Sequence, residues 1–220
     1  MKKMKLSFLV LALSSAVVMP SYGFDIPGVK KESAASGGQS VDASGLQEGL
    51  VKKYVAANVE INTAQTLLAQ SLGLKDSAAS LEANAKALSS GNLDQKSLSG
   101  INQTSENVNQ QISAAMAESK PLSDDSKKLY AESLPHFVKG MGISKDLPAE
   151  LKTFSSSAQQ QISAASMIDK LKVKDKLAVG MYLVSDAPKF ITNTSSTLKS
   201  VLTYAKANKI ETPKNATDVL

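Results

Sequence analysis

The 220-residue chain contains no cysteine, no tryptophan and no arginine. Without cysteine, the chain has no disulfide bond, no cysteine-based zinc site and no thiol catalysis. Without arginine, it lacks the side chain best suited to bidentate contacts with phosphates and base edges. Aromatic residues make up only 5% of the chain. These absences argue against a nucleic-acid-binding protein and predict a core of small and aliphatic side chains.

Residues 1–23 have the pattern of a signal peptide. Three lysines lie within the first five residues, and an apolar run from Leu6 to Val18 follows them. Ser21 and Gly23 then supply the small residues of a cleavage site. The apolar run is shorter than the ~20 residues that a membrane-spanning helix needs. We therefore expect cleavage after Gly23, a periplasmic or secreted mature chain, and no transmembrane segment in it.

Cleavage would also remove much of the positive charge. The whole chain carries 25 lysines and 20 acidic residues, a formal net charge of +5. Three lysines and no acidic residue leave with the signal peptide, so the mature chain has 22 lysines, 20 acidic residues and a net charge of about +2. This near-balance gives no electrostatic footprint for nucleic acid, which we do not expect as a partner.

Composition divides the chain into four segments. The stretch that follows the signal peptide is rich in Gly, Ser and Ala without an apolar period, which is typical of a flexible segment, although Phe24 and Ile26 could instead dock on the fold. Helical periodicity then continues almost without interruption to a polar C-terminal tail. The expected segments are a signal peptide at 1–23, a flexible segment at 24–44, one helical domain at 45–209 and a tail at 210–220.

The hexapeptide Gln-Gln-Ile-Ser-Ala-Ala occurs at 110–115 and again, unchanged, at 160–165. In both copies, apolar residues recur at steps of seven, four and three residues, which is the period of one helix face. These residues are Ile101, Val108, Ile112 and Ala115 in the first copy, and Leu151, Ala158, Ile162 and Ala165 in the second. The repeat predicts two equivalent helices, each the first half of a helical hairpin. The second of them is expected to start near Asp146 and to continue to about Lys170. The predicted fold is an all-α bundle of about six to seven helices with a duplicated helical hairpin.

The residues downstream of each hexapeptide also correspond. Tyr, Ser, Pro and Phe occur in the same order within 130–137 and within 182–190, with one residue inserted in the second segment. The apolar run at 177–184 is short enough to be a buried strand or a helix. Its place in the repeat favours a helix. Pro135 is expected to kink the helix around it, because proline lacks the backbone donor for the preceding turn.

Candidate catalytic groups do not form a recognisable set. His136 is the single histidine, so it would have to serve any Ser-His-Asp triad and would have no second imidazole for a metal. Ser196 and Lys199 match an S-x-x-K pattern, but its companion motifs are absent. Asp124 and Asp125 would point about 100° apart on a helix, which suits capping rather than paired acid–base work. We expect no catalytic site, no metal site and no cofactor.

Lys170, Lys172, Lys174 and Lys176 form the one concentrated charge feature. If the helix that carries the second hexapeptide ends near Lys172, these lysines oppose the negative end of its dipole. In an extended segment all four would share one face, opposite Leu171, and form a partner-binding patch. The second interpretation suits an anionic membrane surface, a cell-envelope polymer or an acidic protein.

The functional hypothesis is an exported, non-enzymatic helical protein that binds a cell-envelope or extracellular partner. That partner is an unknown protein or an anionic envelope surface. The alternative is a helical carrier that holds an apolar small ligand between its helices. A hydrolase of unknown class is the third hypothesis, because no motif supports an enzymatic reaction.

Overall fold

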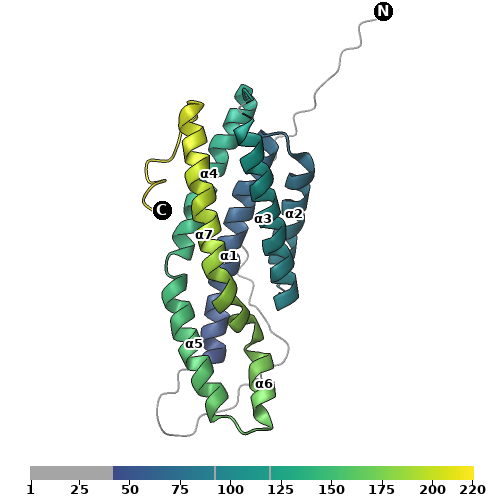
Figure 1. Cartoon of the computed structure of the whole chain (residues 1–220), viewed down its shortest axis with the longest axis vertical. Helices are drawn as coiled ribbons and strands as arrows, with labels where there is room; N and C mark the ends of the chain where they lie inside the picture. Colours follow the sequence, from purple (N-terminus) through teal and green to yellow (C-terminus); the bar gives the residue numbers. More distant parts are fainter. Residues whose placement is uncertain (1–41, 92, 119) are drawn as a thin grey trace, which may run out of the picture. The chain divides into compact units, whose positions relative to one another are not determined.

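The computed structural model describes residues 42–91, 93–118 and 120–220, and these ranges contain helices and no strand (Figure 1). The prediction of an all-α bundle is therefore confirmed. All of the described residues belong to one compact unit, Gly37–Leu220. The helices of the described ranges are α1 (Ala43–Ser71), α2 (Lys75–Ser89), α3 (Gln95–Ala117), α4 (Asp124–Ser144), α5 (Leu147–Ala164), α6 (Asp169–Lys176) and α7 (Ala178–Ala207).

The expected segments at the N-terminus fall almost entirely outside the described residues. The structure does not describe the predicted signal peptide at 1–23. Of the predicted flexible segment at 24–44, it describes only the last three residues. Helix α1 begins at Ala43, two residues before the expected start of the helical domain. At the other end, the tail at 210–220 is less exposed than its polarity suggests, because Ile210 and Ala216 are buried.

Helix α1 is the central element of the bundle and packs against α2, α3, α4, α5 and α7. Its buried side chains include Tyr54, Ile61 and Leu68, which recur at intervals of seven residues and are fully buried. The Asp42 carboxylate accepts hydrogen bonds from two backbone N–H groups at its first turn, which is ordinary N-capping. Gly73 follows the helix with a φ of 77°, a left-handed conformation that glycine adopts without strain.

Helix α4 lies along α1 with the most extensive helix–helix contact of the bundle. Gly140 permits this approach, because a Cβ atom at that position would overlap the side chain of Ile61. Phe137 of α4 is fully buried. Helix α4 continues past Pro135 to Ser144, and Pro135 itself is exposed.

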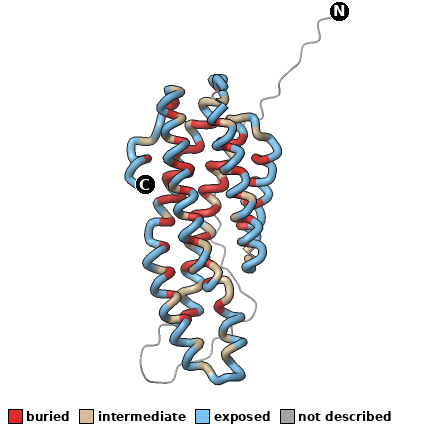
Figure 2. Tube along the Cα trace, viewed as in Figure 1, coloured by how far each residue is buried: buried red, intermediate tan, exposed pale blue. Residues whose placement is uncertain are grey.

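The two hexapeptides have the same helical phase. The first lies inside α3, where Ile101 and Val108 are buried, and the second ends α5, where Leu151 and Ala158 are buried. Figure 2 shows buried positions recurring along one face of these helices. The downstream segments also match in part, because Phe137 in α4 and Phe190 in α7 are both buried, each shortly after a proline within its helix.

The surroundings of the two copies differ. Helix α3 packs against α1, α2 and α7, whereas α5 packs against α1, α6 and α7. Ile112 is fully buried, but Ile162 is only partly buried because α5 ends two residues after it. The two copies thus bury residues at matching positions along their helices but pack against different neighbours. Duplication of one ancestral hairpin stays a prediction.

The helix with the second hexapeptide is shorter than the predicted helix, which was expected to continue to about residue 170. Helix α5 ends at Ala164, and Ala165 adopts an extended conformation with a ψ of 145°. The Ser166 hydroxyl then accepts a hydrogen bond from the backbone N–H of Asp169, which begins the separate helix α6. A side chain that satisfies a free N–H at a helix start explains the break.

The apolar run at 177–184 forms the start of a helix, and the prediction of a helix rather than a buried strand is confirmed. Leu177 precedes α7, and Gly180 and Leu183 are buried within the first turns of that helix. A Cβ atom at Gly180 would overlap the ring of Phe154 in α5. This close approach of α7 to α5 positions the end of the bundle that contains α6.

Candidate functional site

The strongest candidate site is the junction between α5 and α6, at one end of the bundle (Figure 1). We call residues 166–176 the basic-apolar tip. It contains the four lysines that the sequence singled out, together with three large apolar side chains. These seven residues are Lys170, Lys172, Lys174, Lys176, Met167, Ile168 and Leu171.

All four lysines lie on α6, so the extended arrangement that would place them on one face is wrong. Each residue turns an α-helix by about 100°. Lys170, Lys172 and Lys174 therefore lie within about 100° of Leu171 around the helix axis. Lys174 and Lys176 lie in the last turn of α6, where their charges oppose the negative end of its dipole. The dipole interaction that was considered for α5 thus applies to Lys174 and Lys176 of α6. Of the three lysines near Leu171, it leaves Lys170 and Lys172 without that role.

The apolar part of the tip is unusually exposed. Met167 is 88% exposed, Ile168 is 81% exposed and Leu171 is 70% exposed. The other large apolar side chains classed as exposed in the described ranges are Met181 at 36% and Leu220 at 43%. Clustered exposed apolar side chains mark interaction sites more often than scattered ones do.

Sequence reasoning missed this apolar cluster. Met167 and Ile168 follow the second hexapeptide, and a helix that continues to about residue 170 contains both, so apolar periodicity alone does not predict their exposure. One signal was present, because Ser166 and Asp169 are typical of a helix start. Recognising it would have placed the two apolar residues in a turn.

The tip is anchored to the bundle, so its exposed side chains do not result from a loose end. Leu177 is fully buried directly after α6, and Val173 packs against the core. The Gln47 side chain of α1 donates a hydrogen bond to the Lys176 carbonyl at 2.9 Å. It also accepts one from the Gly180 N–H at 2.8 Å. One glutamine thus joins the end of α6 and the start of α7 to α1.

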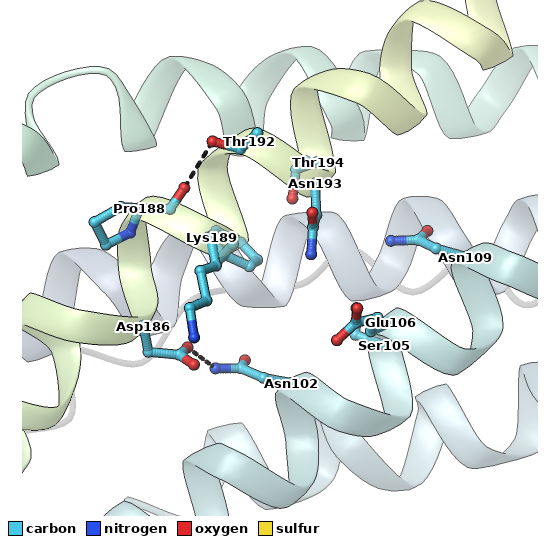
Figure 3. A pocket seen from close by; sticks show the side chains of 11 residues that line it. Asn102, Ser105, Glu106, Asn109, Asp186, Pro188, Lys189, Thr192, Asn193 and Thr194 are labelled. Carbon is cyan, nitrogen blue, oxygen red and sulfur yellow. Dashed lines mark hydrogen bonds between the residues drawn. The ribbon is translucent and has the colours of Figure 1, made fainter.

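A second candidate is a cleft of about 600 Å³ between α3 and α7 (Figure 3). Most of its lining residues carry an amide, a hydroxyl or a charged group, and Pro188 and Phe190 are the apolar members. We call it the polar cleft; it is lined by Asn102, Ser105, Glu106, Asn109, Asp186, Pro188, Lys189, Phe190, Thr192, Asn193 and Thr194. Such a lining does not suit the apolar ligand of the carrier hypothesis.

The floor of the polar cleft is a hydrogen-bond network that joins three helices. The Asp186 carboxylate accepts hydrogen bonds from the Tyr54 hydroxyl at 3.1 Å and from the Asn102 amide. The same amide nitrogen lies 2.7 Å from the Tyr54 hydroxyl and 3.3 Å from the Tyr182 hydroxyl, so its two hydrogens are shared among three acceptors. Burial, with the nearby Asp186 charge, raises the pKa of Tyr54 well above its ordinary value. The contacts join α1, α3 and α7, which gives the network a structural role, while the buried side-chain oxygen of Asn102 has no hydrogen-bond partner among the described residues.

His136 belongs to an ion-pair cluster between α1 and α4. Its Nδ1 atom lies 2.7 Å from one Glu60 carboxylate oxygen, and the Lys139 amine lies 2.6 Å from the other. Burial would raise the pKa of Glu60, but the hydrogen bonds from Lys139 and His136 outweigh it and hold that pKa below its ordinary value. The charged Glu60 therefore clamps the two helices together through His136 and Lys139.

The remaining sequence candidates lie apart on helix surfaces. Asp124 and Asp125 occupy the first turn of α4, where Ser123 accepts a hydrogen bond from the Ser126 N–H. Ser196 and Lys199 are exposed on α7. Within the described ranges, no three His, Asp or Glu side chains are grouped so that they could hold a metal ion. Nor does any helix of those ranges combine the length and the hydropathy needed to cross a bilayer.

Comparisons with known proteins add no functional clue. No protein-family model, no curated protein and no solved structure matches this chain. Functional inference therefore depends on the residues of the chain itself.

Proposed function

We propose that this protein is an exported, non-enzymatic binding protein that attaches to an anionic surface of the cell envelope through the basic-apolar tip. The observation that carries the proposal is the position of four lysines on the same short helix as an exposed apolar cluster. Within the described residues, no group of acidic side chains faces the four lysines, and no apolar surface covers the three exposed apolar side chains. The signal-peptide pattern at 1–23 supports export, although it lies outside the described residues.

Electrostatics favours an anionic partner. Helix α6 contains four lysines and two aspartates, so it has a net charge of +2 over eight residues. Lys172 approaches Asp169 at 3.8 Å, but both side chains are more than half exposed, and such a surface pair contributes little. A lysine held near an anionic bilayer contributes about 1 kcal/mol to binding. The whole mature chain, with a net charge of about +2, is too nearly neutral to attract anions by overall charge.

A binding role accounts for the described chemistry better than an enzymatic one. His136 is engaged with Glu60, and the Asp186 carboxylate is engaged with a buried tyrosine and an asparagine amide. The Tyr54 hydroxyl that contacts Asp186 belongs to a fully buried side chain, so a substrate has no access to it as a nucleophile. The exposed groups that lack an evident structural function gather at the tip instead.

Changing all four tip lysines to glutamine is expected to weaken binding to an anionic surface at least about tenfold. Contributions of about 1 kcal/mol per lysine at an anionic bilayer make this a lower bound. The probes are vesicles with 30% phosphatidylglycerol in phosphatidylcholine and, as a lipid-free polyanion, long-chain polyphosphate. Raising the salt from 50 to 500 mM is expected to weaken binding of the unmodified protein similarly, because salt screens exposed charges.

The matched control changes four exposed lysines elsewhere on the bundle, namely Lys75, Lys86, Lys96 and Lys199, to glutamine. Both variants have the same net charge, so a difference between them reports the position of the charge. Equal weakening of both variants, or no binding to either probe, would overturn the proposal. If the tip lysines serve only the helix dipole, the tip variant should lose about 0.3–1 kcal/mol of stability and bind normally.

A further inference from the structure

We infer that the anionic surface is a lipid bilayer, and that Met167, Ile168 and Leu171 insert into its outer apolar layer while the α6 lysines contact phosphate headgroups. This inference rests on the proposed function and specifies the anionic surface to which the protein binds. An anionic polymer or an acidic protein would satisfy the lysines equally well. What separates the bilayer from them is the exposed apolar cluster.

The three apolar side chains need an apolar environment that a charged polymer does not supply. They are 88%, 81% and 70% exposed and lie within five residues of one another. Amphipathic membrane-binding segments bury such side chains about 5–10 Å into the boundary between headgroups and acyl chains. The lysines beside Leu171 have long aliphatic stems, so their charged ends can stay at the headgroup level while the stems follow the apolar side chains.

A second copy of the chain, or a large protein interface, fits the tip less well. Stable protein–protein interfaces bury about 800 Å² and 20–30 residues on each partner. The tip offers three large apolar side chains in a turn and the first turn of a short helix. A symmetric contact between two tips would also bring eight lysines together, and their repulsion opposes such a dimer. An anionic bilayer instead provides opposite charge and an apolar layer side by side.

The tip is already in the conformation that insertion requires. Val173 and Leu177 attach α6 to the bundle, and the Gln47 hydrogen bonds fix its junction with α7. Insertion therefore orders no additional backbone, and little conformational entropy is lost on binding. Leu171 lies about 200° around α6 from Val173, so the face that holds the bundle and the face that would enter the bilayer are opposite.

The absence of tryptophan makes a direct test possible. Ile168→Trp introduces a single tryptophan at an exposed position, and Leu220→Trp supplies a matched control at another exposed apolar residue. Each variant is titrated with vesicles of 30% phosphatidylglycerol in phosphatidylcholine, and its helicity is checked by circular dichroism. The Ile168→Trp fluorescence is expected to shift to the blue on binding and to be quenched by acyl chains that carry bromine. The Leu220→Trp fluorescence is expected to change in neither respect.

Outcomes of the titration separate this inference from the proposed function. Vesicle binding without a blue shift or bromine quenching at position 168 would overturn insertion and leave charge-driven binding intact. Binding to polyphosphate but not to vesicles would identify a polymer and also overturn insertion. Failure to bind both probes would overturn the proposed function itself.

A second variant tests the apolar cluster through affinity. Changing Met167, Ile168 and Leu171 to glutamine should weaken vesicle binding at least about tenfold and leave polyphosphate binding unchanged, because full burial of such side chains contributes well over a tenfold factor. Equal loss with both probes would show that the substitutions disturb α6 rather than insertion. Unchanged vesicle binding would overturn insertion.

Discussion

Replacing Ile112 by alanine is expected to lower the free energy of unfolding by about 2–5 kcal/mol, the range for a large-to-small change in a core. The same replacement at Ile162 is expected to cost less than half as much. Ile112 is fully buried within α3, whereas Ile162 retains solvent contact in the last turn of α5. Identical hexapeptides thus have unequal energetic roles, because tertiary surroundings decide burial.

Urea denaturation followed by circular dichroism measures both costs in the same protein. Ser113→Ala and Ser163→Ala are the controls, since both serines are exposed and such changes stay within about 0.5 kcal/mol. Equal losses for the two isoleucine variants would contradict the difference in burial. They would instead support structurally equivalent copies, which the repeat alone predicts.

Replacing Phe154 by alanine is expected to cost about 3–5 kcal/mol, because this ring is fully buried between α5 and α7. Gly180→Ala is expected to cost about 1–3 kcal/mol for the opposite reason, overpacking. Its new Cβ atom would overlap the Phe154 ring and approach the Gln47 side-chain oxygen. Thermal or urea melts of both variants check these values.

The combination of the two changes tests the contact itself. Removing the Phe154 ring makes room for a methyl group at position 180, so the double variant should lose less stability than the sum of the two single losses. Residues in contact show such coupling, whereas distant residues give additive effects. Strict additivity in the double-mutant cycle would contradict the close packing of α5 against α7.

Much of the fold was predictable because the helical period in this chain is regular. The apolar steps through Ile101, Val108 and Ile112 identified the buried face of α3, and the matching steps through Leu151 and Ala158 identified that of α5. Periodicity reports the phase of a helix, and phase depends on local sequence. It does not report which helix covers that face or where coverage ends.

Only the basic part of the basic-apolar tip was predictable, because periodicity does not report where a helix ends. The lysines were visible as a charge cluster, but Met167 and Ile168 continued an apolar pattern and were assigned to the preceding helix. A short hydrogen-bonded turn at Ser166 breaks that helix, and the buried Leu177 fixes the new direction. Exposure of the apolar pair follows from this local turn and from the packing of Leu177. Of the two, only the turn has a signal in the sequence, namely the helix-start residues Ser166 and Asp169.

Polar residues in the interior were a second failure of pattern reading. Asn62, Gln65 and Asn84 are buried where α1 meets α2 and α3, although a search for apolar periodicity counts only apolar residues and therefore passes over them. All three side chains form hydrogen bonds. The Asn62 amide donates to the Asn58 carbonyl at 2.9 Å, the Asn84 amide donates to the Ile101 carbonyl at 3.1 Å, and the Gln65 side-chain carbonyl accepts from the Ser105 hydroxyl at 2.6 Å. These hydrogen bonds offset the cost of burying polar side chains, and a single sequence does not reveal which residues form them.

Hydrogen exchange of the vesicle-bound protein tests most directly whether the basic-apolar tip is the binding surface. The unmodified protein is compared with and without vesicles of 30% phosphatidylglycerol, and amide exchange is followed along the described helices. Slower exchange is expected within residues 165–177, with unchanged rates in α2, α3 and the residues of the polar cleft. Protection around the polar cleft on α3 and α7, with unchanged exchange at the tip, would contradict binding through the tip.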